Sequence, residues 1–179
     1  MASYLFQSQR LGFRDWSDAD LEPMTLINQN PKVMEHFPSL QDREMTKGFI
    51  DSQRRCLQAE GCCFFATDLL SSGSFIGLIG FKPIAFEAHF TPGIEIGWRI
   101  AQDHWGMGLA TEGATACLHY AFETLNIDRI FSFTTTQNKR SESVMQKIGM
   151  RPIGQFDHPK LPGGHPMRRH VLYQITRPK

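Results

Sequence analysis

The segment that most constrains this chain is a strand-like run followed closely by a glycine-rich turn and a helix start. Ile94-Glu-Ile-Gly-Trp-Arg-Ile100 has the alternation of a β-strand, and Trp105-Gly-Met-Gly-Leu-Ala-Thr-Glu112 comes after it. Glycines let the main chain approach a ligand closely, and the unpaired N–H groups of a first helical turn attract an anion. The small Ala110 and Thr111 keep this turn uncrowded. The segment therefore predicts a phosphate or pyrophosphate site.

Three kinds of phosphate-binding loop compete for this segment. A Walker-type loop requires Gly-Lys-Ser/Thr, which the turn lacks. A dinucleotide-binding turn needs a third glycine where Thr111 stands; Asp128 lies near the expected spacing of ~20 residues, but it precedes its strand. The third pattern is Arg/Gln-x-x-Gly-x-Gly/Ala. Gly108-Leu-Ala110 supplies its second half, and Trp105 stands in its Arg/Gln position.

The order of the expected elements indicates an α+β fold. The chain has 179 residues, of which 41% are apolar, and this is enough for one domain over 1–179 with a core at about 10–176. Three strands with hairpin-length gaps predict an antiparallel meander in the middle of the chain. Strands are expected at 11–14, 63–67, 74–81, 93–100, 127–136, 151–156 and 170–176. Helices are expected after Ser17, between Pro31 and Phe37, and at 44–60, 111–124 and 140–148.

Further motifs occur in a fixed order along the chain. They are Arg10-Leu-Gly-Phe-Arg14, Asn138-Lys-Arg-Ser141, Lys147-Ile-Gly-Met150 and His170-Val-Leu-Tyr173. With the Trp105–Glu112 segment, they make the chain similar to the GNAT acetyltransferases. Within that superfamily, the Trp-Gly-x-Gly-x-Ala-Thr-Glu variant resembles the Rim-type enzymes, which acetylate the N-termini of ribosomal proteins.

The resemblance implies a GNAT fold and an acyl donor, acetyl-coenzyme A. The implied sheet is mixed and mostly antiparallel, has helices on both faces, and splays between the strand ending near Ile100 and the strand at 127–136. The donor's pyrophosphate is expected at 107–111, and its pantetheine arm is expected along the main chain of 98–100. The implied donor-binding residues are Trp98, Arg99, Ile100, Trp105, Gly106, Met107, Gly108, Leu109, Ala110, Thr111, Asn138 and Ser141.

The implied chemistry is direct attack of an amine on the thioester, without an acyl-enzyme. Glu95 is the expected general base because its strand flanks the splay; an ordinary salt-bridged glutamate is the other interpretation. Glu112 is an alternative base, although a carboxylate in the first turn of a helix also stabilises that helix. Met145 stands where many relatives have a proton-donating tyrosine. Ser141 is therefore the expected donor to the leaving thiolate, with helix capping as its alternative role.

The acceptor is expected to be an N-terminal α-amine of a peptide or protein. An α-amine has a pKa of about 8 and a lysine one of about 10.4, so the α-amine is more easily made neutral near pH 7. A small-molecule amine, such as an amino acid, a polyamine or an aminoglycoside, is the close alternative. A non-catalytic sensor that binds acyl-coenzyme A is a third.

Composition and the remaining motifs exclude several other partners. The formal net charge is +1, so we expect neither a nucleic-acid nor a membrane partner. The N-terminal residues lack the apolar run of a signal peptide, and a cytoplasmic location is expected. Four cysteines without CxxC spacing, and histidines separated by Pro and Gly, indicate no metal site. Enzymes of this kind are often homodimers, so a homodimer is one assembly that the resemblance allows for this chain.

Overall fold

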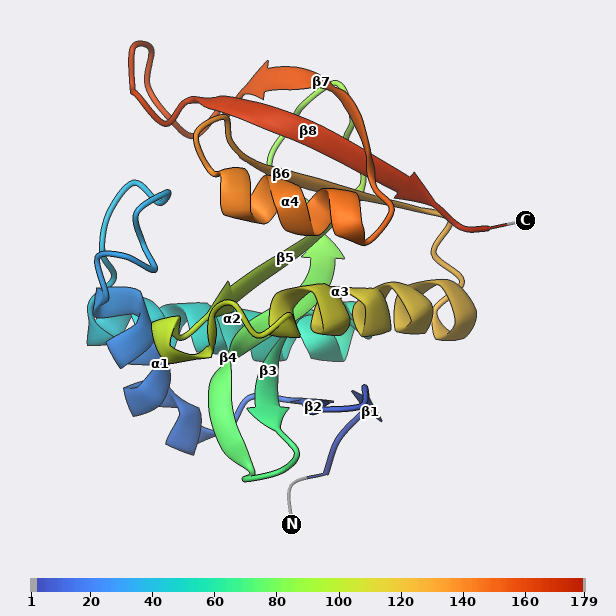
Figure 1. Ribbon diagram of the computed structural model, residues 1–179. Helices are drawn as coiled ribbons and strands as arrows, with labels where there is room; N and C mark the ends of the chain where they lie inside the picture. The colour runs from blue at the N-terminus through green and yellow to red at the C-terminus, as the bar shows by residue number, and fades with distance from the viewer. Residues whose placement is uncertain (1–2, 179) are drawn as a thin grey trace.

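The computed structural model describes residues 3–178, and in that part the strands form one eight-stranded sheet (Figure 1). Its strand order is β1-β2-β3-β4-β5-β6-β8-β7. Every neighbouring pair is antiparallel except β5 and β6, which are parallel. The strands are β1 Phe6–Gln7, β2 Leu11–Arg14, β3 Phe64–Leu69, β4 Ser74–Pro83, β5 Ile94–Ile100, β6 Arg129–Thr135, β7 Arg151–Asp157 and β8 Arg169–Thr176.

Helices cover both faces of this sheet (Figure 1). They are α1 Leu21–Gln29, α2 Arg43–Glu60, α3 Leu109–His119 and α4 Lys139–Lys147, with 3₁₀ turns at Asp18–Asp20 and Gln102–His104 and a π-helical turn at Tyr120–Thr124. One buried cluster joins α3 and α4 to the sheet, and a second joins α1 and α2 to Ala66 and Leu78. The expected α+β fold, with a mixed and mostly antiparallel sheet between helices, is confirmed. Over residues 3–178, no helix has the length and apolar character needed to cross a bilayer.

The splay of the sheet lies between β5 and β6. These two strands share only two registered positions, Ile94 with Ile130 and Glu95 with Phe131. Just beyond them, the hydroxyl of Ser132 donates a hydrogen bond to the carbonyl of Ile96 at 3.0 Å. A side chain thus takes the place of the next main-chain bond, and the two strands then part.

Helix α3 packs very closely against the sheet beside the splay. Gly113 faces the sheet, where a β-carbon would overlap the side chain of Ile79. Ala114, Cys117 and Leu118 continue the buried stripe of the helix. This close approach fixes the helix axis, and with it the position of the turn that precedes the helix.

Two expected elements differ from those observed. The segment between Pro31 and Phe37 forms turns and no helix, because Asn30 caps the first of them and Pro38 follows directly. Only one i→i−4 bond forms there, from Met34 to Asn30, and one bond does not propagate a helix. The helix expected at 111–124 begins earlier, at Leu109, since Gly108 is its N-cap.

A buried ion network connects β2 to its neighbours. The guanidinium of Arg14 contacts Asp20 and Asp68 at 2.7 Å each, and the three side chains are 13%, 4% and 2% exposed. Burial alone would raise the pKa of Asp20, but hydrogen bonds from Arg14 and Ser17 outweigh that effect and lower it. Folding therefore favours the ionised form of Asp20.

Replacing Arg14 with methionine should lower the free energy of unfolding by about 3–5 kcal/mol, because two buried carboxylates lose their partner. Arg43→Met is the control: Arg43 and Glu22 form an exposed pair, whose loss should cost no more than about 1 kcal/mol. The contribution of Asp20 is present above its unfolded pKa of about 3.9 and is lost as the pH falls through its lower folded value. The difference in the free energy of unfolding between wild type and Arg14→Met, measured by urea titration, should therefore shrink at acidic pH. Equal losses of unfolding free energy in Arg14→Met and Arg43→Met at neutral pH would contradict the prediction.

Candidate active site

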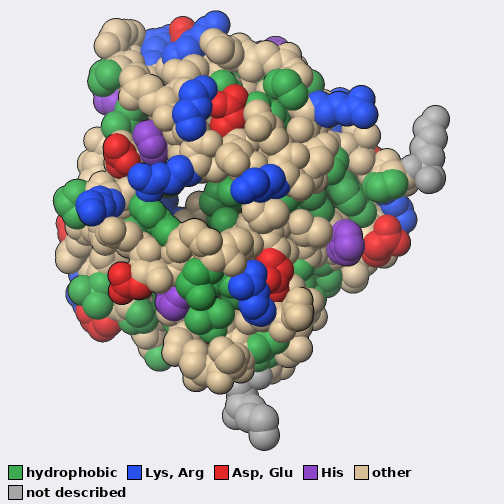
Figure 2. Space-filling model, in the orientation of Figure 1, with side chains coloured by type: hydrophobic (Ala, Val, Ile, Leu, Met, Phe, Trp, Pro, Cys, Tyr) green, Lys and Arg blue, Asp and Glu red, His purple; other side chains and the backbone are tan. Residues whose placement is uncertain are grey.

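A cavity of about 1120 Å³ occupies the splay between β5 and β6. Its walls come from β5, β6, the turn before α3, the start of α4 and the loop between α1 and α2. Figure 2 shows the hollow on this face, with lysine and arginine side chains around it. Of the residues expected to form the site, all line this cavity except Met107.

The edge of β5 that faces the cavity has main-chain groups that β6 does not pair beyond Glu95. The carbonyl of Ile96 points toward β6, where it accepts the bond from Ser132. Main-chain groups alternate along a strand, so those of Trp98 and Ile100 point the same way. Because β6 has already parted from β5 at this level, an extended polar ligand can pair with Trp98.

The turn that leads into α3 is shaped by two glycines with left-handed backbone. Gly106 and Gly108 have φ angles of 76° and 77°, which favour glycine over other residues. Gly108 is the N-cap of α3, and no side chain caps this helix, so its first N–H groups remain available to an anion. The indole of Trp105 donates to the carbonyl of Ile100 at 2.8 Å. Trp105 thereby ties the turn to the end of β5.

Met107 is placed differently from its neighbours in the turn. Its side chain is exposed, and its carbonyl accepts a hydrogen bond from Arg10 at 3.0 Å. The side chain of Met107 therefore points away from the cavity. Any part that Met107 takes in binding comes from its main chain.

Cations on α4, two at its start and Lys147 at its end, were not expected from the sequence. Lys139, Arg140 and Lys147 line the cavity, and the guanidinium of Arg140 lies 4.7 Å from the centre of the Trp105 ring. This places a delocalised cation beside the glycine-rich turn. The basic pair that follows Asn138 was the signal available in the sequence.

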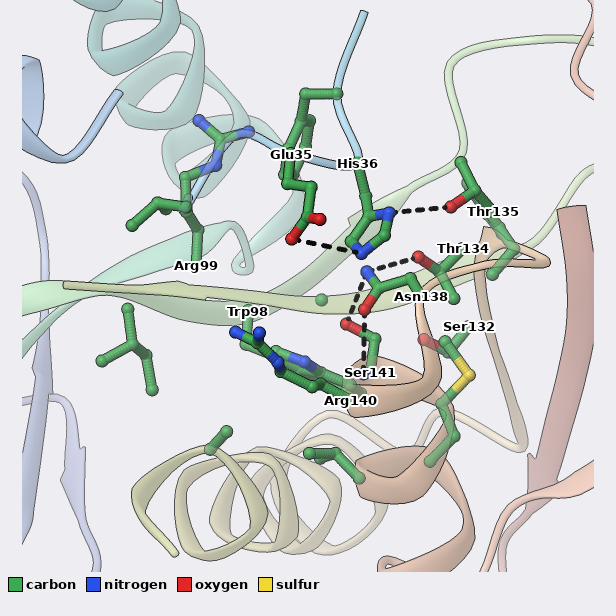
Figure 3. Close-up of a pocket in the computed structure, with 18 of the residues that line it drawn as sticks. Glu35, His36, Trp98, Arg99, Ser132, Thr134, Thr135, Asn138, Arg140 and Ser141 are labelled. Atoms are coloured by element: carbon green, nitrogen blue, oxygen red, sulfur yellow. Dashed lines mark hydrogen bonds and ion pairs between the residues drawn. The ribbon is translucent and has the colours of Figure 1, made fainter. Parts of the chain in front are cut away.

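Asn138 organises the first turn of α4 (Figure 3). Its side-chain oxygen accepts from the main chain of Ser141 at 3.2 Å, which caps the helix. Its amide group donates to Thr134 at 2.9 Å and to the hydroxyl of Ser141 at 3.1 Å. Because this hydroxyl accepts from Asn138, its own hydrogen is free to be donated. Met145 is buried, and no tyrosine is found among the described residues that line the cavity.

Glu95 lies on β5 at the point where the splay begins. Its side chain is 16% exposed, and it contacts the ammonium of Lys82 at 3.1 Å. Burial raises the pKa of Glu95, and the nearby Lys82 and Lys160 only partly offset that effect. A raised pKa makes the carboxylate a stronger base, which suits proton abstraction near neutral pH.

Glu112, the alternative base, has other partners and does not line the cavity. It accepts from the Ser8 hydroxyl at 2.7 Å and from Arg10 through both the main chain, at 2.8 Å, and the guanidinium, at 2.6 Å. Burial would raise the pKa of Glu112, but these hydrogen bonds outweigh it and lower the pKa. Glu112 thus attaches the N-terminal segment to α3.

Known proteins share both the sequence pattern and the fold. Residues 10–151 match the family model described as an acetyltransferase (GNAT) domain. An uncharacterized protein, YkkB, of Bacillus subtilis (strain 168) is 30% identical over 80% of this chain and 83% of its own. The [ribosomal protein uS5]-alanine N-acetyltransferase of Escherichia coli (strain K12) is 34% identical over 46% of this chain and 42% of its own.

A solved structure agrees with these sequence relatives. The crystal structure of an acetyltransferase (GNAT family) from Bacillus anthracis has a TM-score of 0.79 and 26% identity, and the match covers 95% of this chain and 96% of that one. The chain belongs to the GNAT family of N-acetyltransferases.

Proposed function

We propose that this acetyltransferase moves the acetyl group of acetyl-coenzyme A to the N-terminal α-amine of a peptide or protein. The observation that carries the proposal is the placement of Glu95 and Ser141 on two walls of one cavity, β5 and α4. One is a carboxylate with a raised pKa, and the other is a hydroxyl whose hydrogen is free. Acyl transfer to an amine needs a base and a donor of these kinds.

The donor would lie along the open edge of β5. Its pyrophosphate would bind to the N–H groups between Gly106 and Thr111, with the Arg140 cation beside them. Its pantetheine arm would pair with the main chain of Trp98. This arrangement would bring the thioester to the point where β5 and β6 part, between Glu95 and Ser141.

The reaction would proceed by direct attack. The amine nitrogen forms a bond to the thioester carbon while Glu95 accepts a proton from the nitrogen, directly or through water. The carbon–sulfur bond then breaks, and the sulfur leaves with a hydrogen bond from Ser141. The proton held by Glu95 passes to solvent, and coenzyme A departs as the free thiol once its sulfur is protonated.

Two considerations favour an α-amine as the acceptor. Its pKa of about 8 leaves far more of it neutral near pH 7 than of a lysine. The Escherichia coli relative is named for an alanine, whose side chain has no nitrogen, so the name refers to a main-chain amine. Small-molecule amines are the second candidate class, and a sensor that binds the donor without turnover is the third.

The first experiment combines calorimetry with a free-thiol release assay. We expect acetyl-coenzyme A to bind and thiol to be released with peptides that begin with Ser or Ala. The same assay should include polyamines, amino acids and aminoglycosides. Turnover on a small amine alone would show that the acceptor is a small molecule and not a peptide. Binding of acetyl-coenzyme A without turnover would indicate a sensor, and absence of binding would refute the proposed donor site.

Glu95→Gln should lower kcat by roughly 10²- to 10⁴-fold while the affinity for acetyl-coenzyme A stays close to wild type. Activity of the wild type should fall as the pH decreases through the raised pKa of Glu95, since the base must be ionised. Glu95→Gln should lose this acidic limb. Glu112→Gln is the matched control and should retain the limb and most of kcat; a loss of the limb in Glu112→Gln instead would assign the base to Glu112.

Gly108→Val should weaken the binding of acetyl-coenzyme A at least about tenfold, because a β-branched residue opposes the positive φ that shapes the turn. Gly73→Val, in the β3–β4 hairpin, is the matched control: Gly73 has a φ of 69°, and a β-carbon there would meet nothing within 4 Å. Both variants should be destabilised, but only Gly108→Val should change the dissociation constant measured by calorimetry. Equal dissociation constants for the two variants would show that the donor does not bind at this turn.

A further inference from the structure

The Arg99 side chain lies on the opposite side of β5 from Trp98 (Figure 3). Its guanidinium donates to Asn28 of α1 at 2.6 Å and lies 4.2 Å from the centre of the Phe37 ring. Alternation along the strand places Glu95, Gly97 and Arg99 on this side. The donor is assigned to the other side, so Arg99 belongs to the half of the cavity left for the acceptor.

Arg99 is a buried cation that is paired with no carboxylate among the described residues. Its Nε is buried without a hydrogen-bond partner. Burial lowers the pKa of Arg99 to about 10, which still leaves it charged at neutral pH. Arg14, which is also largely buried, is instead held by two carboxylates. An uncompensated buried charge is costly, so a functional reason for Arg99 is expected.

The remaining charges in the acceptor half do not supply the missing anion. Glu95 is paired with Lys82 at 3.1 Å, and Glu35 lies 3.9 Å from His36. Lys32 and Lys160 add further positive charge to the lining. This half of the cavity therefore favours an anionic group and opposes a polycation.

We propose that Arg99 binds a carboxylate of the acceptor, and that the acceptor is therefore a carboxylate-bearing amine. This inference rests on the proposed function and narrows its acceptor. Between the two side chains the ring of Phe64 packs against Gly97, where a β-carbon would lie 3.3 Å from it, so this ring forms the floor of the cavity there. The Cα atoms of Glu95 and Arg99 are about 13 Å apart along the strand, and both side chains reach into the cavity. An acceptor can thus be held by its carboxylate at Arg99 while its amine lies near Glu95.

The test compares acceptors that differ only in one negative charge. The dipeptide Ala-Ala and its C-terminal amide form one pair, and Ala-Glu and Ala-Gln peptides with amidated C-termini form the other. Wild type should prefer the acid of at least one pair, and which pair shows the preference tells an α-carboxylate from an acidic side chain. Arg99→Gln should raise KM for the preferred acid roughly tenfold to a hundredfold and leave its neutral partner nearly unchanged.

Two further variants separate recognition from folding. Arg99→Lys keeps the charge without the planar fork and should lose only part of the preference. Arg55→Gln removes an exposed arginine of α2 that has no ion-pair partner among the described residues. It should change neither the KM for the preferred acid nor the KM for its neutral partner. The KM for acetyl-coenzyme A should be the same in all variants.

A binding measurement keeps this inference separate from the question of turnover. Calorimetry measures the binding of the N-acetylated form of the preferred acid to protein saturated with coenzyme A. If no amine is turned over, the N-acetylated forms of both acids are titrated instead. Binding should weaken in Arg99→Gln by the same factor as the KM, even if no amine is turned over. The inference would be overturned by equal KM values for acid and amide in both pairs of the wild type. It would also be overturned if Arg99→Gln raised the KM of acid and amide equally, or if the product bound wild type and Arg99→Gln with the same affinity.

Discussion

The early parting of β5 and β6 is the constraint on which the rest of the site depends. Had the two strands continued to pair beyond Glu95 and Phe131, β6 would satisfy the main chain of Trp98 and fill the cavity. The Ser132 hydroxyl ends the ladder by occupying the carbonyl of Ile96. What remains is an open strand edge inside the protein, which is costly unless a ligand covers it. In the proposed complex, the donor would pair with the same groups that other sheets use to pair strands.

In the proposed complex, β5 would also separate the two substrates, because its side chains alternate. The side chains of Trp98 and Arg99 lie on opposite sides of β5 (Figure 3), and Arg99 reaches Asn28 of α1. Alternation places Glu95 on the same side of the strand as Arg99. A donor on one side and an acceptor on the other can meet only at the strand edge. Close packing of α3, which needs Gly113, brings the glycine-rich turn to that edge. Two substrates held by one strand in this way would suit the proposed direct attack, which needs no acyl-enzyme.

Local patterns predicted most of the fold and the glycine-rich turn before α3, but they did not reveal contacts between residues far apart in the sequence. The glycine turn and the alternation of β5 are properties of neighbouring residues, so the sequence was enough to predict them. Helix capping was expected as the alternative role of Ser141, whereas Asn138 caps α4. The role of Glu112 depends on Ser8 and Arg10, which are about a hundred positions away, and the sequence offered no spacing that would join them. The same holds for the pairing of Lys82 with Glu95, which arises only when β4 lies beside β5.

The cations of the acceptor half bear on catalysis as well as on recognition. An amine must be neutral to attack, and positive charge nearby lowers the pKa of a bound amine by disfavouring its protonated form. Arg99, Lys82 and Lys160 would act in this direction, while Glu95 acts against it until it accepts the proton. A purely acidic pocket would bind a cationic amine more tightly but would keep it protonated. A carboxylate on the acceptor resolves this conflict: it supplies the attraction at Arg99, and the amine then meets surroundings that favour its neutral form.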